Sequence, residues 1–166
     1  ITAGQLKTLF GKPLAEIAAL VFPKYPENEQ LRLIDGCCEA EHALLHITGA
    51  PLYEDLEKAL QILSAQYPLY IVSNSQCGYI ELFLEKTGFA KYFHGHLCNG
   101  DTGLDKGYNI RQIADQNGLK DPVYVGDTMG DFEACRKAGV PFVLAEYGFG
   151  EVPEPDMRIS KPMDLI

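Results

Sequence analysis

The stretch "PVYVGDTMGDFEACRKAGV", residues 122–140, decides how the second half of this chain folds. An apolar run at 123–125 leads into Gly-Asp127, and a second acid, Asp131, follows four residues later. A helical pattern then continues to Gly139, a residue type that commonly ends helices. The stretch therefore predicts a buried strand, a turn with two carboxylates, and a helix.

The same alternation of strand and helix fills residues 67–166. Predicted strands lie at 69–73, 95–98, 123–127, 141–148 and, at an edge, 157–159, and predicted helices at 77–88, 107–118 and 130–139. Apolar strands separated by short helices are typical of parallel βαβ units with right-handed crossovers. We therefore expect an α/β fold in which the strands at 69–73, 123–126 and 141–145 share one parallel sheet.

Residues 1–66 have a helical pattern almost throughout and predict a separate helical unit. Thr2 and Gln5 form a T-x-x-Q capping box, and Gly11 is expected to end the first helix. Further helices are predicted at 14–22, 27–47 and 53–65. The chain thus divides into a helical unit, 1–66, and an α/β unit, 67–166.

Composition disfavours several classes of partner. The formal net charge is −9, which disfavours nucleic acid and anionic membranes because binding to them requires clusters of Lys and Arg. There is no run of about 18 apolar residues and no signal-peptide pattern at the start. Five scattered cysteines without C-x-x-C spacing favour a reduced, cytoplasmic protein without structural zinc.

Asp127 and Asp131 are candidate metal ligands. Two neighbouring carboxylates resist joint ionisation unless a cation lies between them. Oxygen ligands of this kind suit Mg²⁺, which takes its remaining ligands from water and substrate phosphate. The alternative is that Asp127 is a turn residue and Asp131 an acid that stabilises a helix N-terminus.

Three other residues are candidates for binding phosphate. Ser73 and Asn74 follow a strand and precede a helix, where polar side chains and free N–H groups hold phosphate well, although an ordinary helix cap explains them too. Lys106 lies near a helix start, where a cation opposes the helix dipole, so either a chemical role or an ordinary surface lysine remains open. A lysine beside phosphate neutralises its charge.

The order of these motifs is more specific than any one of them. Lys106 follows Ser73 by 33 residues, and Asp127 follows Lys106 by 21. This arrangement resembles the haloacid dehalogenase superfamily, in its phosphoglycolate phosphatase-like branch with a helical cap. Ser73, Lys106 and "VGDTMGD" resemble the second, third and fourth motifs of that family. The resemblance implies a Rossmann-like parallel sheet at 67–166 and a cap at 1–66.

One family motif is missing from this sequence. Family members begin with a strand ending in D-x-D-x-[TV], whose first Asp is the nucleophile and whose second is the general acid/base. The nearest string here, "LIDGCCEAE" at 33–41, does not match it. The resemblance therefore predicts that the nucleophile lies upstream of residue 1. Residues 1–166 alone should be inactive and should leave a gap between the strands at 69–73 and 123–126.

The resemblance implies a Mg²⁺-dependent phosphomonoester hydrolase that acts through an aspartyl-phosphate. Ser73 and Asn74 would hold the phosphoryl group, Lys106 would neutralise its charge, and Asp127 with Asp131 would position the metal. The alternatives are a 2-haloacid dehalogenase of the same fold, which the acid at Asp127 disfavours, and a non-catalytic phosphate-binding protein.

The expected substrate is a small phosphorylated metabolite, and the resemblance suggests phosphoglycolate. Lys12, in the predicted cap, is a candidate for contacting the substrate. The oligomeric state is left open by the sequence.

Several other residues are weaker candidates. His42 and His46 are spaced i, i+4 on a predicted helix and are best explained as part of an acidic cap surface. His94 and His96 alternate on a predicted strand, but no third ligand accompanies them in sequence. Cys77 opens a helix beside the expected phosphate site without a nearby histidine.

Overall fold

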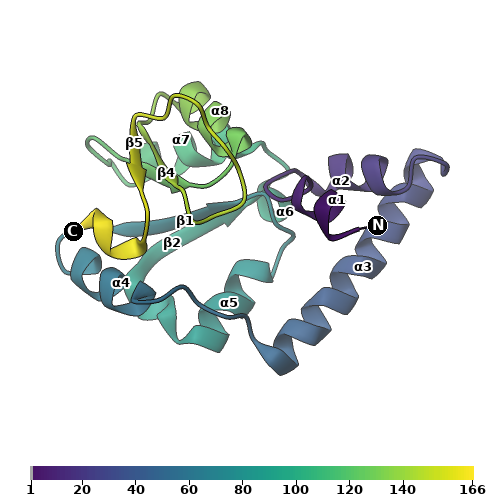
Figure 1. Ribbon diagram of the computed structural model, residues 1–166, viewed down its shortest axis with the longest axis horizontal. Coiled ribbons are helices and arrows are strands. Elements are labelled where there is room, and N and C mark those ends of the chain that lie inside the picture. Colours follow the sequence, from purple (N-terminus) through teal and green to yellow (C-terminus); the bar gives the residue numbers. More distant parts are fainter. Residues whose placement is uncertain (1) are drawn as a thin grey trace.

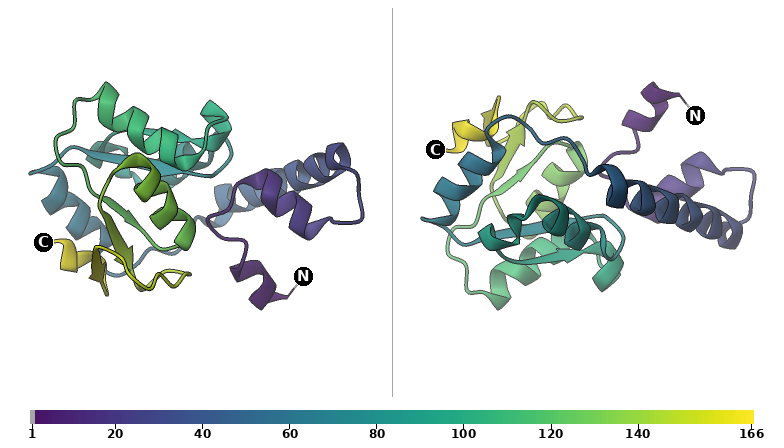
Figure 2. Two further views of the ribbon diagram at one scale, coloured as in Figure 1. Left: turned by 90° about the horizontal axis from the view of Figure 1, so that it is seen from above. Right: turned by 90° about the horizontal axis from the view of Figure 1, so that it is seen from below.

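The computed structural model describes residues 2–166, and it has two parts (Figure 1). Helices α1 (Ala3–Lys7), α2 (Leu14–Val21) and α3 (Glu27–Thr48) form an arm. The arm projects to one side of an α/β part that begins with α4 (Leu56–Ser64), as both views of Figure 2 show. No described helix is both long enough and apolar enough to cross a lipid bilayer.

The start of the arm follows from local sequence. The predicted capping box is present: Gln5 N donates to Thr2 Oγ1 (3.3 Å), and Thr2 N donates to the Gln5 side chain (2.9 Å). The prediction that α1 extends to Gly11 is wrong, because the helix ends at Lys7. The hydroxyl of Thr8 bonds back to the carbonyl of Gln5 (2.8 Å), a local bond that competes with regular helix.

The α/β part contains the expected alternation of strands and helices. Its elements are β1 (Leu69–Ser73), α5 (Tyr79–Thr87), η1 (Phe89–Tyr92), β2 (Phe93–Cys98), α6 (Asn99–Thr102), α7 (Lys106–Gln116), β3 (Tyr124–Gly126), α8 (Met129–Ala138), β4 (Phe142–Ala145), β5 (Met157–Ile159) and η2 (Pro162–Leu165). Every strand pair is parallel, so the predicted α/β class with parallel strands is confirmed.

The strands form two sheets instead of the single expected one. β1 pairs with β2, and β3 pairs with β4, which pairs with β5. The prediction of one sheet that includes β1 and β3 is therefore wrong for residues 2–166, whereas the expected break between these two strands is present. The two edges approach each other, since the hydroxyl of Tyr124 donates to the carbonyl of Val72 at 2.9 Å.

Three apolar clusters of described residues hold the α/β part together, and the two larger ones involve the helices. One surrounds Phe142 of β4, which is fully buried between the sheet and α8. The other surrounds Phe89, and Leu56 and Leu60 of α4 pack against it. Packing thus places α4 with the α/β part, although it precedes residue 67. The predicted domain boundary at 66/67 stays a prediction.

Candidate active site

Lys106 and Asp131, at the starts of α7 and α8, form a buried ion pair. Asp105 caps α7 by accepting a hydrogen bond from Tyr108 N (3.0 Å), which makes Lys106 the first residue of that helix. Lys106 Nζ lies 2.6 Å from Asp131 Oδ1, and the two residues are only 8% and 3% exposed. Lys106, whose positive charge is unfavourable at the N-terminus of α7, is therefore paired with Asp131.

The remaining carboxylate oxygen of Asp131 is also fully engaged. Its Oδ2 accepts from Thr128 N (3.0 Å), Thr128 Oγ1 (2.7 Å) and Asp127 N (3.2 Å). Burial opposes ionisation, but the charge and hydrogen bond of Lys106, with the bonds from Thr128, outweigh it, and the pKa of Asp131 lies below its usual range. Asp131 thus anchors Lys106 and caps α8.

Asp127 is in a different electrostatic situation. It lies half-buried directly after β3, and its Oδ2 accepts a hydrogen bond from Phe149 N at 2.9 Å. Burial and the nearby charge of Asp131 raise its pKa, and the hydrogen bond from Phe149 N and the charge of Lys106 only partly offset them. A carboxylate held in this way gains from an added cation, so Asp127 fits the role of a metal ligand better than Asp131.

A glycine-rich loop, residues 147–150, closes over Asp127. A Cβ atom at Gly148 would lie 2.2 Å from the Cβ of Asp127, and one at Gly150 would lie 2.5 Å from its carbonyl oxygen. Gly150 N also donates to that carbonyl at 2.9 Å. The absence of side chains at these two positions therefore allows the loop to enclose the carboxylate.

Asn74 and Ser73 lie at the end of β1 with different environments. Asn74 Nδ2 donates to the carbonyl of Gly11 in the arm (2.7 Å), while its Oδ1 is buried and has no partner among the described residues. Ser73 Oγ accepts from Ser75 N at 3.1 Å, which is an ordinary turn contact. Asn74 therefore links the strand end to the arm, and Ser73 shapes the turn that presents it.

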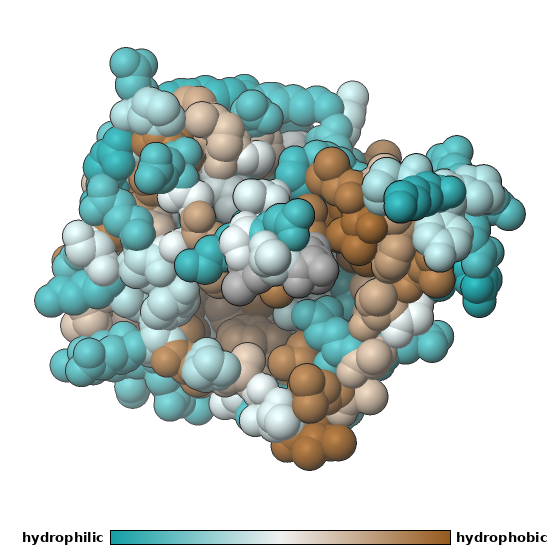
Figure 3. Space-filling view, turned by 45° about the vertical axis from the view of Figure 1, so that its right-hand side comes forward, coloured by the Kyte–Doolittle hydropathy of each residue, from teal (hydrophilic) through white to brown (hydrophobic). Residues whose placement is uncertain are grey.

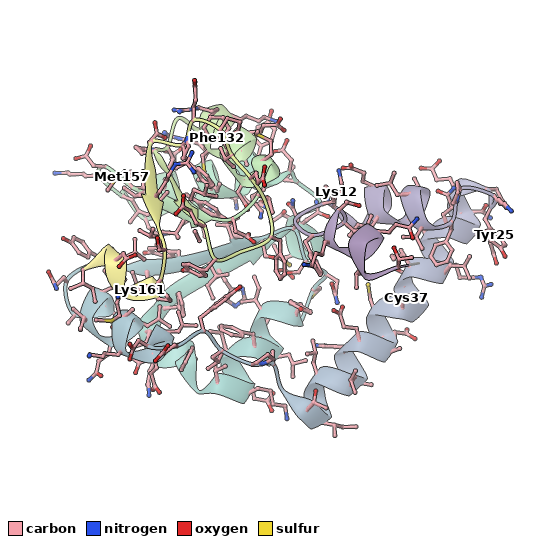
Figure 4. All side chains as sticks on the ribbon, in the orientation of Figure 1. Lys12, Tyr25, Cys37, Phe132, Met157 and Lys161 are labelled. Atoms are coloured by element: carbon pink, nitrogen blue, oxygen red, sulfur yellow. The ribbon has the colours of Figure 1, made fainter. Side chains whose placement is uncertain are left out.

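A pocket of about 720 Å³ lies where the arm meets the α/β part. Lys12, Asn74 and Lys106 line it, and Lys12, which pairs with Glu16, lies at this junction in Figure 4. Ser73, Asp127 and Asp131 are not among the lining residues. The structure thus brings three of the predicted residues to one pocket and places the acid pair behind it.

Thr128 lines the pocket but was not singled out from the sequence, and it lies against Gly11, which was predicted as a helix end. Gly11 has a φ of +80°, and a Cβ there would lie 2.9 Å from Thr128 Oγ1. Thr128 itself forms a capping box with Asp131, a T-x-x-D pattern that was readable in the sequence. The contact between Gly11 and Thr128 had no sequence signal, because it joins segments more than a hundred residues apart.

Comparisons with known proteins identify the family of the chain. The sequence profile of the haloacid dehalogenase-like hydrolase family matches residues 1–145, and the chain belongs to this family. A phosphoglycolate phosphatase from Escherichia coli K12 is 26% identical over 174 residues; the match covers 99% of this chain and 66% of the relative. The chain thus spans just under two thirds of that relative.

Solved structures share the fold. A haloacid dehalogenase-like family hydrolase from Streptococcus pneumoniae matches with a TM-score of 0.85 at 22% identity, over 99% of this chain and 80% of the other. A 2-haloacid dehalogenase from Pseudomonas syringae matches with a TM-score of 0.63 at 21% identity, over 96% and 69%. Proteins with different names therefore share this fold, so the activity of this chain must be argued from the side chains of its site.

Proposed function

We propose that the protein is a Mg²⁺-dependent phosphomonoester hydrolase for a small phosphorylated metabolite, with phosphoglycolate as the first substrate to test. The observation that carries the proposal is the buried Lys106–Asp131 pair beside Asp127, with Asn74 in the pocket that Lys106 lines. A buried lysine fixed near a carboxylate with a raised pKa suits the binding of phosphate and a divalent cation together. The curated phosphoglycolate phosphatase relative supports the substrate class.

Each side chain has a role that its contacts support. Lys106, held by Asp131, neutralises charge on the phosphoryl oxygens, and the amide of Asn74 orients the same group. Asp127 would hold the cation, which when bound would stabilise the negative charge of the phosphoryl transition state. The metal role predicted for Asp131 stays a prediction, but its engaged oxygens favour a role in positioning Lys106.

The acceptor carboxylate is proposed to lie outside residues 1–166, on a strand that enters between β1 and β3. Both facing edges lack a backbone partner strand in the described residues, and Asn74 and Asp127 follow the ends of these two strands. A strand in this position would deliver a nucleophile between the phosphate-binding residues and the metal-binding acid. The phosphoryl group would pass to that carboxylate and then to water.

Steady-state hydrolysis of an aryl phosphate by the full-length protein tests the metal role. Asp127→Asn should lower kcat by about 100-fold or more, because it removes a charge that holds the cation. Asp121→Asn is the matched control: Asp121 is exposed, and its φ of 51° is one that Asn tolerates. Full activity in excess chelator would contradict the proposal and favour the dehalogenase alternative.

Trapping of the covalent intermediate tests where the nucleophile lies. The full-length protein is mixed with substrate, quenched in acid, reduced with borohydride and digested. Mass spectrometry should then find the reduced acyl-phosphate site in a peptide outside residues 1–166. A labelled peptide within residues 1–166 would contradict this assignment.

A further inference from the structure

A second cluster of ionisable side chains lies away from the pocket. Glu81 in the first turn of α5, His96 of β2 and Asp101 of α6 each offer one ligand atom, and these atoms all lie within 4.8 Å of one another. None of the three residues lines the pocket that contains Lys106. The cluster therefore needs an explanation separate from the proposed phosphatase site.

Close backbone contact fixes the elements that carry this cluster. Gly100 N of α6 donates to the carbonyl of Ser75 at 3.0 Å. A Cβ at Gly100 would lie 2.2 Å from the backbone nitrogen of Cys77, so only glycine allows α6 to pack against the start of the α5 segment. Glu81 and Asp101 are thereby brought to the same side of β2, although 20 residues separate them in sequence.

The imidazole of His96 makes no hydrogen bond with the described residues. Its Nε2 lies 4.0 Å from Glu81 Oε1, which is beyond hydrogen-bonding distance. Its Nδ1 is buried and has no hydrogen-bond partner among the described residues. Buried polar atoms are nearly always satisfied, and neither nitrogen of the His96 ring has a hydrogen-bond partner among the described residues, although Nε2 faces Glu81. An unpaired imidazole beside two carboxylates points to a ligand.

Two thiols surround Asp101 and orient it. Cys98 is buried and its Sγ donates to Asp101 Oδ2 at 3.0 Å. Cys77 is exposed and lies close enough that hydrogen bonding to Asp101 raises the pKa of its thiol. Side chains that hold a carboxylate in this way are common around metal ligands, where they fix the ligand orientation.

We propose that Glu81, His96 and Asp101 form a binding site for a transition-metal cation, with Zn²⁺ as the best match. Imidazole with carboxylate suits Zn²⁺, whereas Mg²⁺ prefers oxygen ligands alone. Zinc bonds of about 2.0–2.2 Å place ligand atoms no more than roughly 4.3 Å apart. Ligand atoms within 4.8 Å reach this geometry by small rotations of Glu81 and Asp101, which are both exposed.

The site revises an expectation drawn from sequence. No third ligand accompanied His96 along the chain, and the scattered cysteines favoured a protein without structural zinc. The tertiary structure supplies the missing ligands from α5 and α6. A cation there would tie these two helices to β2, outside the pocket.

Competition with a chromophoric zinc chelator tests the site in the purified full-length protein. Excess Mg²⁺ is present, and every protein carries Asp127→Asn so that the proposed active site takes up no zinc. One Zn²⁺ per chain should bind, and His96→Gln should weaken binding by more than about 100-fold, because even changes to supporting residues cost about 10–100-fold. The measurement needs no turnover, so its outcome is independent of the proposed function.

Matched controls come from the same elements. His94→Gln changes an exposed histidine of β2, whose ring centroid lies 5.9 Å from that of Tyr70, and should leave zinc affinity unchanged because His94 is not in the cluster. Glu81→Gln should weaken binding by at least about tenfold, whereas Glu85→Gln, at an exposed position one turn further along α5, should not.

Folding is checked by the thermal midpoint without zinc. Glu81 is half exposed, so its variant keeps the test valid if His96→Gln unfolds the protein. Equal zinc affinity in Glu81→Gln and Glu85→Gln, or no zinc binding by the parent protein, would overturn the proposal.

Discussion

The helical arm buries a smaller share of its side chains than the α/β part does. α3 has 22 residues and buries only Ile34, whereas the ten residues of α8 bury four. Figure 3 shows hydrophobic side chains on the surface of the arm, and Leu44 and Ile47 of α3 are 59% and 84% exposed. Local helix propensity and capping therefore matter more in the arm, and burial matters more in the α/β part.

The largest difference should appear when an apolar side chain is truncated in each part. Phe142→Ala removes a fully buried ring of β4 and should lower the free energy of unfolding by about 4 kcal/mol. Leu44→Ala, on the arm, should change it by less than about 0.5 kcal/mol. Urea unfolding measures both values. Similar costs would mean that the arm is as tightly packed as the sheet.

Ion pairs should show the next largest contrast. Lys106→Met leaves the buried charge of Asp131 without its partner and should cost about 3 kcal/mol. Arg111→Met breaks an exposed pair with Asp115 on the same helix and should cost less than about 0.5 kcal/mol. Urea unfolding at neutral pH distinguishes the two variants.

The pH dependence follows from the same pair. The lowered pKa of Asp131 contributes stability above the unfolded carboxyl pKa of about 3.9, and that stability is lost as the pH falls through the folded value. The free energy of unfolding should therefore decrease less steeply with falling pH in Lys106→Met than in the parent protein. An unchanged acid profile would show that Lys106 does not hold the pKa of Asp131 down.

Two glycines of the arm should respond to alanine in opposite directions. Gly11→Ala places a Cβ against Thr128 at a positive φ and should cost about 1–2 kcal/mol. Gly36→Ala, inside α3 with no atom within 4 Å of the new Cβ, should stabilise the protein by about 0.5–1 kcal/mol. Thermal unfolding measures both shifts, and a stabilising Gly11→Ala would contradict the described contact between arm and α8.

The smallest expected effect is a gain in stability from Asp127→Asn, a variant expected to lose activity under the proposed function. The raised pKa of Asp127 means that its contribution to stability is present below the unfolded carboxyl pKa and is lost as the pH rises through the folded value. The ionised carboxylate of Asp127 therefore destabilises the folded protein at neutral pH. Asp127→Asn should unfold at a slightly higher urea concentration than the parent protein. The gain should vanish in acid, and its persistence there would exclude this explanation.

Much of the local structure was predictable because its signals are local. The strand at 69–73 and the helix that ends before Gly139 follow from hydrophobic period and stop residues, and both agree with the structure. The candidate residues Lys106 and Asp127 were found by their place at element ends. The end of α1 was predicted wrongly: after Lys7 the backbone N–H groups of Thr8 and Leu9 bond three residues back, a change to turn geometry that a pattern of apolar residues does not reveal.

The sequence by itself determined the parallel α/β class, the helical arm and the family to which the chain belongs, since periodicity, caps and motif order are written along the chain. Only the tertiary structure decided which atoms meet. It separated β1 from β3, turned Asp131 towards Lys106, and placed Glu81 and Asp101 beside His96. The reason is physical: these contacts depend on how strands and helices pack in three dimensions, and residues distant in sequence carry no local signal of their neighbours.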